Sequence, residues 1–434
     1  MTALAITLCL ASASLILLRP TRSASFAALG FTLTGALPFL ILSGTFDAVS
    51  AALPNLLFAS EGQARIAVQT IAIMSGLLLS AAWFQGVQEM PDKGEFLLGR
   101  LKVVYGVVWS ARIILVLQGA YFWAQVADIM FGPWYSVLSQ IASLGIVIAL
   151  LSRLSKVALS SRKYLFLIVL ELAWVVPSGA RQSILETVLV LALGSIIFGS
   201  RREKIAICLI GAALVPVAST LFVFLGEMRN IVPLVSQFEL WNPAGIRDAI
   251  EATAQLSEGV AAEVPMLSAT AARLFDQQFL GVVTTDFRRF YEAYLYAEYL
   301  PAQMISATFP NFLLGGAAPT VQLPLNLWFP FLVGGSQPVT YLGEGYLNFG
   351  WFGVGIWGIF ATGMCCLADV LFRSIKSPVA FVVSLWWRVK LIYLVTAPLA
   401  FWIATLRNSL LLALALTVLT QPWSETWGWL RQRS

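Results

Sequence analysis

The sequence contains no histidine, and only 11% of its 434 residues are charged. Without histidine the chain lacks the usual general base, the Ser-His-Asp triad and the most common zinc ligand. Its four cysteines fall in or beside apolar runs, which predicts neither a disulfide framework nor a cysteine metal site. Walker and dinucleotide-binding glycine motifs are also missing. We therefore expect no metal and no cofactor, and chemistry that relies on carboxylates, arginine, tyrosine or backbone dipoles.

Apolar residues dominate the chain, at 59% of the total, and the mean hydropathy is +0.82. Such values exclude a water-soluble domain and predict a polytopic membrane protein. A bilayer core needs roughly 20 apolar residues per helix, and about eleven stretches qualify. Because these stretches are continuous and do not alternate, the predicted fold is all-α and not a barrel. The predicted spans centre near residues 10, 35, 74, 113, 142, 170, 190, 215, 356, 392 and 414.

Basic residues occur in every second loop, which fixes those loops on the cytoplasmic side. The N-terminus is then outside and the C-terminus inside, and the first apolar run is a retained span because its arginines follow it. The pI of 9.1 reports this topology and does not predict nucleic-acid binding. The basic loop residues are Arg19, Arg22, Lys93, Arg100, Lys102, Arg153, Lys156, Arg162, Lys163, Arg201, Arg202, Lys204, Arg373, Lys376, Arg431 and Arg433.

One long break divides the spans into an N-terminal eight-span bundle, 1–225, an external loop, 226–342, and a C-terminal three-span bundle, 343–434. The loop holds five arginines, no lysine and ten acidic residues, which is consistent with the outer side. Within it, 246–262 predicts an amphipathic helix, and the proline- and glycine-rich stretch 310–338 predicts a re-entrant or surface segment.

Arg181 follows the Pro-Ser-Gly-Ala turn at 177–180 and is expected in the first turn of the seventh span. A cation there opposes the helix dipole unless an anion is shared between its side chain and the free N–H groups of that turn. Arg181 is therefore either a phosphate ligand, an interfacial arginine that reaches lipid phosphates, or an ion-pair partner of Glu186.

The other candidate cations lie in or after the long loop. The use of arginine without lysine favours bidentate capture of phosphate or carboxylate, and Arg273 and Arg288 lie in the more apolar half of the loop. Some of the loop arginines must form plain ion pairs with the acidic residues. Arg407, which we place at the outer end of the tenth span, either completes the cationic pocket or anchors its helix at the interface.

Aromatic residues crowd 287–299, where Tyr291 and Tyr294 could stack on sugar rings or anchor the loop at the headgroup level. The loop ends in Gly343-Glu344-Gly345-Tyr346-Leu347-Asn348-Phe349-Gly350, directly before an apolar run. Glu344 is either a base that aligns a sugar hydroxyl or an acid favoured by a helix dipole. Asn348 adds an amide that can bind sugar hydroxyls.

Three features, in this order, resemble the oligosaccharide repeat-unit polymerases of bacterial surface polysaccharides, the Wzy-like group related to O-antigen ligases. They are the turn Ser178-Gly179-Ala180-Arg181, a long external loop with Arg273 and Gly281, and the acidic-aromatic-Asn-Phe-Gly element that runs from Glu344 to Gly353. The resemblance covers roughly residues 165–410. It departs at 309–312, where many members carry a Pro-Arg pair and a later Lys-Pro, and no cation appears there before Gly343.

The resemblance implies a C-type membrane glycosyltransferase architecture and transfer of a growing glycan from undecaprenyl pyrophosphate to a new lipid-linked repeat unit. This reaction would take place on the outer face of the bacterial inner membrane. The partners would be the undecaprenyl-pyrophosphate-linked oligosaccharide and membrane lipids, while a chain-length regulator is left open. The expected catalytic residues are Glu344 and Arg181, the pyrophosphate ligands are Arg181, Arg273, Arg288 and Arg407, and the glycan ligands are Tyr291, Tyr294 and Asn348.

Two rival functions remain at this point. An O-antigen-ligase-like transferase is the closer one, but that family's usual external histidine is missing. A lipid-linked oligosaccharide flippase or other transporter would use charges within the spans as a relay, and Arg112, Glu171 and Glu186 lie there. Against a transporter, the two sides of the loop are unequal and show no inverted repeat of broken helices.

Overall fold

The computed structural model describes the chain in several separate ranges, and every element within them is a helix, as the sequence predicts. The all-α prediction is therefore confirmed for the described part of the chain. The described residues are 2–18, 22–53, 59–84, 189, 202, 205–206, 209, 220, 224, 243–290, 294–296, 298–309, 340–375 and 377–420.

Four described helical segments are long and apolar enough to cross a membrane: Ser23–Leu42, Glu61–Phe84, Tyr341–Ser374 and Leu399–Val418. They coincide with the predicted spans near 35, 74, 356 and 414. Two 17-residue helices follow the same pattern: α1 (Thr2–Leu18) coincides with the predicted span near 10, and α18 (Pro378–Leu394) overlaps the one near 392 but is centred six residues earlier. The predicted spans near 113, 142, 170, 190 and 215 lie outside the described residues. The chain is thus a membrane protein by the length and composition of its helices.

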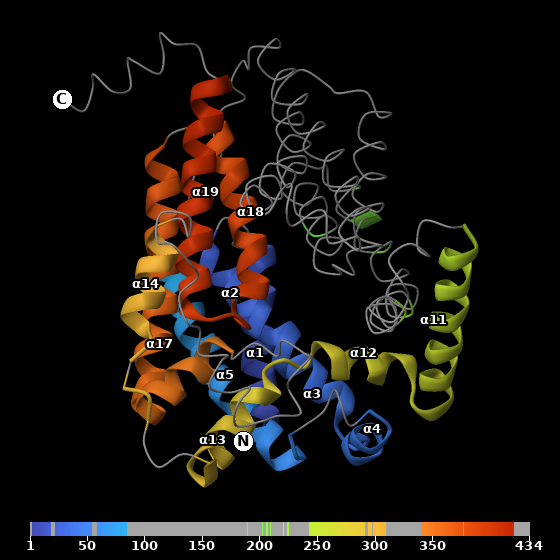
Figure 1. The fold of residues 1–434 in the computed structure, drawn as a ribbon. Coiled ribbons are helices and arrows are strands. Elements are labelled where there is room, and N and C mark those ends of the chain that lie inside the picture. The colour runs from blue at the N-terminus through green and yellow to red at the C-terminus, as the bar shows by residue number, and fades with distance from the viewer. Residues whose placement is uncertain are drawn as a thin grey trace, which may run out of the picture. The chain divides into compact units, whose positions relative to one another are not determined.

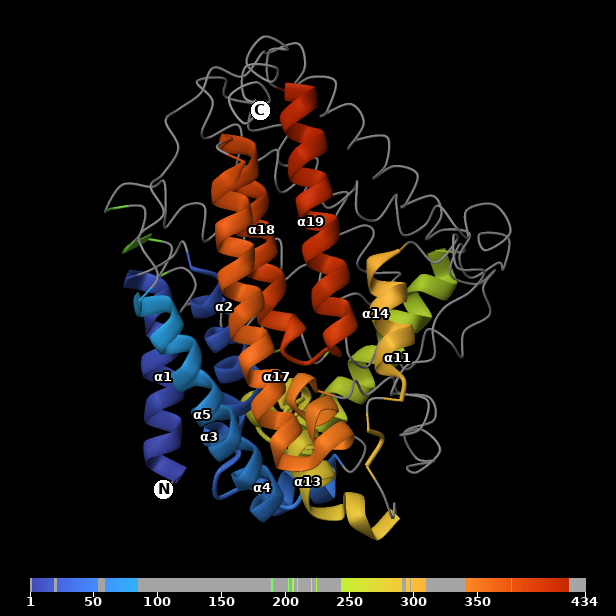
Figure 2. The same ribbon diagram turned by 90° about the vertical axis from the view of Figure 1, so that its left-hand side faces the viewer.

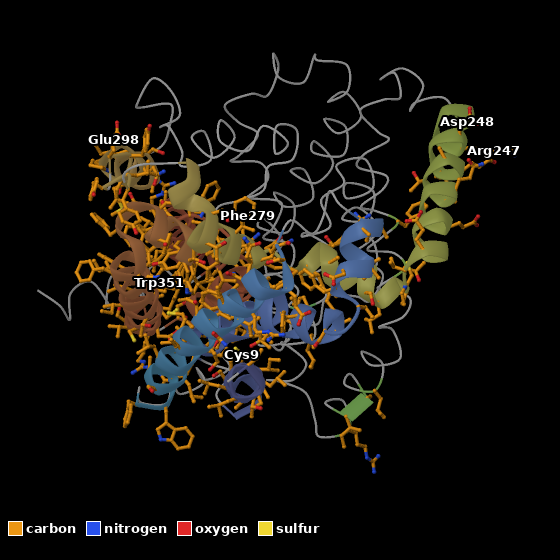
Figure 3. The ribbon with its side chains drawn as sticks, turned by 90° about the horizontal axis from the view of Figure 1, so that it is seen from below. Cys9, Arg247, Asp248, Phe279, Glu298 and Trp351 are labelled. Atoms are coloured by element: carbon orange, nitrogen blue, oxygen red, sulfur yellow. The ribbon has the colours of Figure 1, made fainter. Side chains whose placement is uncertain are left out.

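The chain divides into two compact units, and each is described here by itself. The first contains Met1–Glu89, Leu267–Ser374 and Trp387–Leu410, and the second contains the remainder. In the second unit, α11 (Pro243–Glu263) confirms the amphipathic helix predicted at 246–262, and its Arg247 and Asp248 are exposed (Figure 3). The three-part division at 225 and 342 stays a prediction.

The N-terminal part of the first unit is a close-packed set of helices. α1, α2 (Ser23–Phe31) and α5 (Glu61–Phe84) lie side by side (Figure 1). α2 also lies in close backbone contact with α18, because a Cβ added at Gly30 would lie 2.6 Å from the Ile392 carbonyl oxygen. After α2 the chain makes one wide turn, η1 (Thr32–Ala36), and continues as α3 (Leu37–Leu42) and α4 (Phe46–Ala52).

Part of the predicted external loop is hydrogen-bonded to the wide turn η1. That part contains α12 (Met266–Leu274), α13 (Gln278–Phe290) and α14 (Leu300–Thr308). Between α12 and α13 the fully buried Gln277 donates its backbone N–H to the Thr34 carbonyl at 3.2 Å and its side-chain N–H to the Val395 carbonyl at 3.2 Å. A π-type turn breaks the usual hydrogen-bond ladder of a helix, so a carbonyl can accept such an outside donor. The loop is therefore anchored among the spans.

The C-terminal helices run beside this group. α17 (Tyr341–Ser374), α18 and α19 (Leu399–Thr420) appear together in Figure 2. One face of α17 is apolar and exposed. Its residues recur at helical spacing and are Phe352, Ile359, Leu367 and Val370. A continuous apolar stripe of this kind is expected to face lipid, so α17 lies at an edge of the described bundle.

Candidate functional site

The glycine-rich element at the end of the external loop forms a sharp turn inside α17. Phe349 (φ −142°, ψ 20°) and Gly350 (φ 63°, ψ −146°) leave the helical conformation and separate a short segment, 341–348, from a long one, 351–374. The positive φ of Gly350 lies in the region that favours glycine. We call residues 349–350 the α17 turn.

The two segments of α17 fold back on one another at this turn. A Cβ added at Gly345 would lie 2.7 Å from the Gly353 carbonyl oxygen, and one added at Gly353 would overlap the Gly345 carbonyl oxygen. In a straight helix, residues 344 and 357 would be about 20 Å apart along the axis. Here their side chains are hydrogen-bonded. The glycines of this motif are thus required for backbone contact between the two segments.

Glu344 lies on the short segment and is fully buried, with 0% of its surface exposed. Its Oε2 accepts a hydrogen bond from the Trp357 indole N–H at 3.1 Å and another from the Leu399 backbone N–H at 2.7 Å. Leu399 is the first residue of α19, so the carboxylate lies at the positive end of that helix dipole. Glu344 therefore joins the two segments of α17 to the start of α19.

The helix-dipole alternative for Glu344 thus fits its contacts, although the dipole is that of α19 and not that of its own helix. The two donors to the Glu344 Oε2, the Trp357 indole and the Leu399 backbone N–H, are neutral groups. A catalytic role for Glu344 stays a prediction.

The carbonyl end of the short segment is capped by the external loop. The backbone N–H groups of Leu295 and Tyr296 donate to the carbonyls of Leu347 and Asn348 at 3.0 and 3.1 Å. The last carbonyls of a helix have no partner within the helix, so these two bonds satisfy groups that would otherwise need water. Asn348 is buried and its side-chain N–H donates to the Glu344 carbonyl at 2.9 Å. Its predicted glycan contact stays a prediction.

Tyr294 lies directly over the α17 turn. A Cβ at Gly350 would be 2.7 Å from the Tyr294 hydroxyl oxygen and 2.9 Å from the adjacent ring carbon. Its ring also meets that of Tyr346 edge-on, with centroids 6.0 Å apart. Figure 3 labels Trp351, the first residue after the turn, and Phe279 on the neighbouring α13. Glu344 and Asn348 were predicted from one motif and Tyr294 from another stretch, and the structure brings the three together around one turn.

The structure gives less detail for the predicted cations of the loop and of the seventh span. Arg273 is half-buried in the last turn of α12, and Arg288 belongs to α13, with a side chain outside the described residues. Arg181 and Tyr291 also lie outside the described residues.

Arg407 lies inside α19, and its predicted position at the end of a span is wrong. It follows Leu399, the first residue of α19, by eight positions, which is about 12 Å along the axis. Its Nε and Nη2 donate to Oδ1 of the adjacent Asn408 at 3.1 and 3.0 Å. In the described part of the chain, its Nη1 is buried and has no hydrogen-bond partner.

A second buried carboxylate was missed at the sequence level. Asp369, near the opposite end of α17 and 1% exposed, accepts from the Arg388 guanidinium at 3.1 Å and from the Ser23 hydroxyl at 2.7 Å. The Ser23 backbone N–H, at the start of α2, also donates to Asp369. The available signal was an acid and an arginine inside two apolar runs joined by a short loop, because charges within spans usually pair.

These contacts define what the site can do chemically. Next to the α17 turn, Glu344 accepts hydrogen bonds from two donors, and the Arg407 guanidinium, with one unfilled donor, lies about two turns along α19. Such an arrangement can hold an anion and orient a neighbouring group, because buried cations in spans are matched by anions. Comparison of the chain with family models, curated proteins and solved structures finds no match in any of the three.

Proposed function

We propose that the protein is a membrane glycosyltransferase that polymerises lipid-linked oligosaccharide repeat units into a surface polysaccharide. The donor glycan would be carried on undecaprenyl pyrophosphate at the outer face of a bacterial inner membrane. In this reaction, an acceptor sugar hydroxyl attacks the anomeric carbon of the donor glycan. The bond between the anomeric carbon and the pyrophosphate oxygen breaks, the pyrophosphate leaves with the electron pair, and the hydroxyl proton passes to the leaving pyrophosphate.

The observation that carries the proposal is the environment of Arg407. An arginine inside a span is costly and almost always faces the bundle interior, a polar cavity or a counter-charge. Arg407 shares its face of α19 with the exposed residues Leu411 and Leu414, and its side-chain bonds go to the neutral Asn408. A pyrophosphate would supply the missing acceptor oxygens and the negative charge. Stabilising that leaving group electrostatically requires neither metal nor nucleotide.

The segment around the α17 turn supports the same proposal through its contact with Leu399, the first residue of α19. Its acidic-aromatic-Asn-Phe-Gly element, the feature that resembles the polymerase family, is folded into a compact unit with Glu344 bound to Leu399. Glu344 thereby holds the turn against the helix that carries Arg407. In our proposal it positions this helix end, and Arg181, Arg273 and Arg288 remain further proposed ligands of the pyrophosphate.

Deletion of the gene in its own host tests the function. The expected result is collapse of the surface glycan from long polymer to single repeat units, measured as its size distribution on gels. Polymer that persists on its carrier lipid would support a ligase instead. Repeat units that stay on the cytoplasmic face would support a flippase, and either result contradicts the proposal.

Complementation with Arg407 variants tests the site. We expect Arg407→Gln to leave mostly single repeat units and Arg407→Lys to restore shorter chains, because lysine keeps the charge but loses the planar, bidentate geometry. Arg247→Gln is the matched control, since Arg247 is exposed on α11 and bonded to Glu251. Protein levels in the membrane must be equal. Full-length polymer made by the Arg407→Gln variant would contradict a role for Arg407 in the mechanism.

A further inference from the structure

Five aromatic side chains around the α17 turn form a connected array, which we call the aromatic ladder: Tyr296, Tyr294, Tyr346, Trp351 and Phe349. The ring of Tyr294 meets those of Tyr296 and Tyr346 at centroid distances of 6.3 and 6.0 Å, with interplanar angles of 89° and 84°. Tyr346 meets Trp351 at 5.3 Å and 79°. These near-perpendicular contacts are the favoured edge-to-face geometry of aromatic rings, so the rings hold one another in place.

The ladder is buried in its middle and exposed at two places. Tyr346 is only 5% exposed, whereas Tyr296 is 64% exposed and Trp351 is 54% exposed. Tyr346 belongs to the hydrophobic cluster of Val283 and Leu347, and Tyr294 packs against that cluster. These two rings contact the exposed rings of Trp351 and Tyr296. Two large aromatic surfaces are therefore held rigidly at the outside of the described structure, next to the α17 turn.

The backbone at Tyr296 is held in an unusual conformation. Its φ is +46°, the only positive φ of a residue other than glycine in the described part of the chain. Such a conformation is strained for a residue with a Cβ, and strain of this kind is concentrated at functional positions. Here the hydrogen bonds of Leu295 and Tyr296 to the end of the short α17 segment fix the strained residue. A residue that only anchored the loop in lipid would not require this conformation.

Ring contacts also connect the ladder to the buried acid. Tyr296 meets Phe349 at 6.4 Å, Phe349 meets Trp357 at 6.4 Å, and the Trp357 indole donates its N–H to Glu344. The exposed surface and the carboxylate thus belong to one packed unit. A molecule seated on Tyr296 would lie against the turn that Glu344 fixes to α19.

We propose that Tyr296 and Trp351 form a carbohydrate-stacking surface that receives pyranose rings of the glycan. This inference rests on the proposed function for the source of the sugar. Pyranose rings present C–H groups with partial positive charge, which pack on the negative face of an aromatic ring. Because the ladder is already rigid, little side-chain entropy is lost on binding. Tyr294 and Tyr346 support the stacking rings and do not contact the sugar themselves.

Binding of lipid-free repeat-unit oligosaccharide, released from the host's own polysaccharide, tests the proposal by calorimetry on the full-length protein in lipid nanodiscs. We expect Tyr296→Ala and Trp351→Ala each to weaken binding about tenfold, and Tyr296→Phe to bind like the wild type because it keeps the ring. Phe352→Ala is the matched control, since Phe352 is adjacent to Trp351, is 74% exposed and makes no ring contact in the described part of the chain.

Three outcomes would overturn the stacking surface: wild-type binding by both alanine variants, an equal loss in Phe352→Ala, or no binding of the oligosaccharide by the wild type at millimolar concentration. Wild-type glycan affinity combined with weaker retention in vesicles would identify the rings as membrane anchors. If gene deletion leaves polymer length unchanged while the alanine variants still lose binding, the polymerase proposal fails and the stacking surface stands.

Discussion

The two ends of α17 each carry a buried carboxylate that accepts a hydrogen bond from the first backbone N–H of another helix. Asp369 binds the start of α2 through Ser23 and also binds the Arg388 guanidinium. Glu344 binds the start of α19 through Leu399, and its second donor is the neutral Trp357 indole. Asp369 is therefore a member of a buried ion pair, and Glu344 lies at the positive end of the α19 dipole.

This difference separates a structural site from a site suited to chemistry. Removing the Asp369 carboxylate would leave Arg388 as a buried cation without its ion-pair partner, which is strongly unfavourable. Removing the Glu344 carboxylate would leave the neutral donors of Trp357 and Leu399 without this acceptor. The Glu344 end also carries the α17 turn and the aromatic ladder, whereas the Asp369 end joins three helices. We infer that stability depends mainly on Asp369 and function on the surroundings of Glu344.

The largest expected effect is that of Asp369→Ala, because it strands Arg388, which is 0% exposed. We expect a loss of about 3–5 kcal/mol in the free energy of unfolding, measured by reversible unfolding in mixed micelles. Combining Asp369→Leu with Arg388→Met should recover most of the loss, since both charges of the pair are then removed. Glu61→Ala is the control, and removing its exposed pair with Arg65 should cost below about 0.5 kcal/mol.

Gly353→Ala should come next, with an expected loss of about 3 kcal/mol. The added methyl group would overlap the Gly345 carbonyl oxygen, a backbone atom that cannot move aside without opening the fold-back. Gly355→Ala is the matched control two residues along the same helix, where a Cβ meets nothing within 4 Å. It should be neutral or stabilising by up to about 1 kcal/mol, because alanine favours the helix. Equal melting temperatures for the two variants would contradict the fold-back.

Glu344→Ala should cost about 2 kcal/mol, since it leaves the Trp357 and Leu399 donors buried without their acceptor. Glu344→Gln keeps an acceptor oxygen and should cost about 1 kcal/mol or less. The decisive measurement is polymer length at equal protein levels. If Glu344 only positions the turn, the Glu344→Gln variant should still make long polymer. If Glu344 is a catalytic base, the same change should abolish polymer formation. A stability loss in Glu344→Gln as large as that of Asp369→Ala would remove the contrast between the two ends.

Trp357→Phe should show the smallest effect, about 1 kcal/mol, because it removes one hydrogen bond and keeps most of the apolar side chain. Trp402→Phe is a suitable comparison, since its buried indole N–H donates to the Leu394 carbonyl and not to Glu344. Polymer length should change in Trp357→Phe more than in Trp402→Phe if Glu344 must be held in place. Equal polymer lengths in the two variants would argue against that role.

Sequence reasoning located the important element and several of its residues but not their contacts. Glycine, an acid, aromatics and asparagine before an apolar run indicated a functional turn, and Glu344, Asn348 and Tyr294 do meet there. The fold-back of α17 was not predicted, because composition shows an apolar helix and does not show a reversal in direction within it. The position of Arg407 inside α19 was missed for a related reason, since apolar runs define the boundaries of spans only loosely.

The amino-acid sequence by itself determined that the protein is an all-helical membrane protein, because lipid requires helices of about 20 apolar residues with internally bonded backbones. It also determined the glycines without which the α17 turn could not form. Only the tertiary structure decided which donors surround each acid. Residues 344 and 399, or 369 and 23, are distant in the chain, and the direction in which each helix packs determines which helix N-terminus reaches which carboxylate.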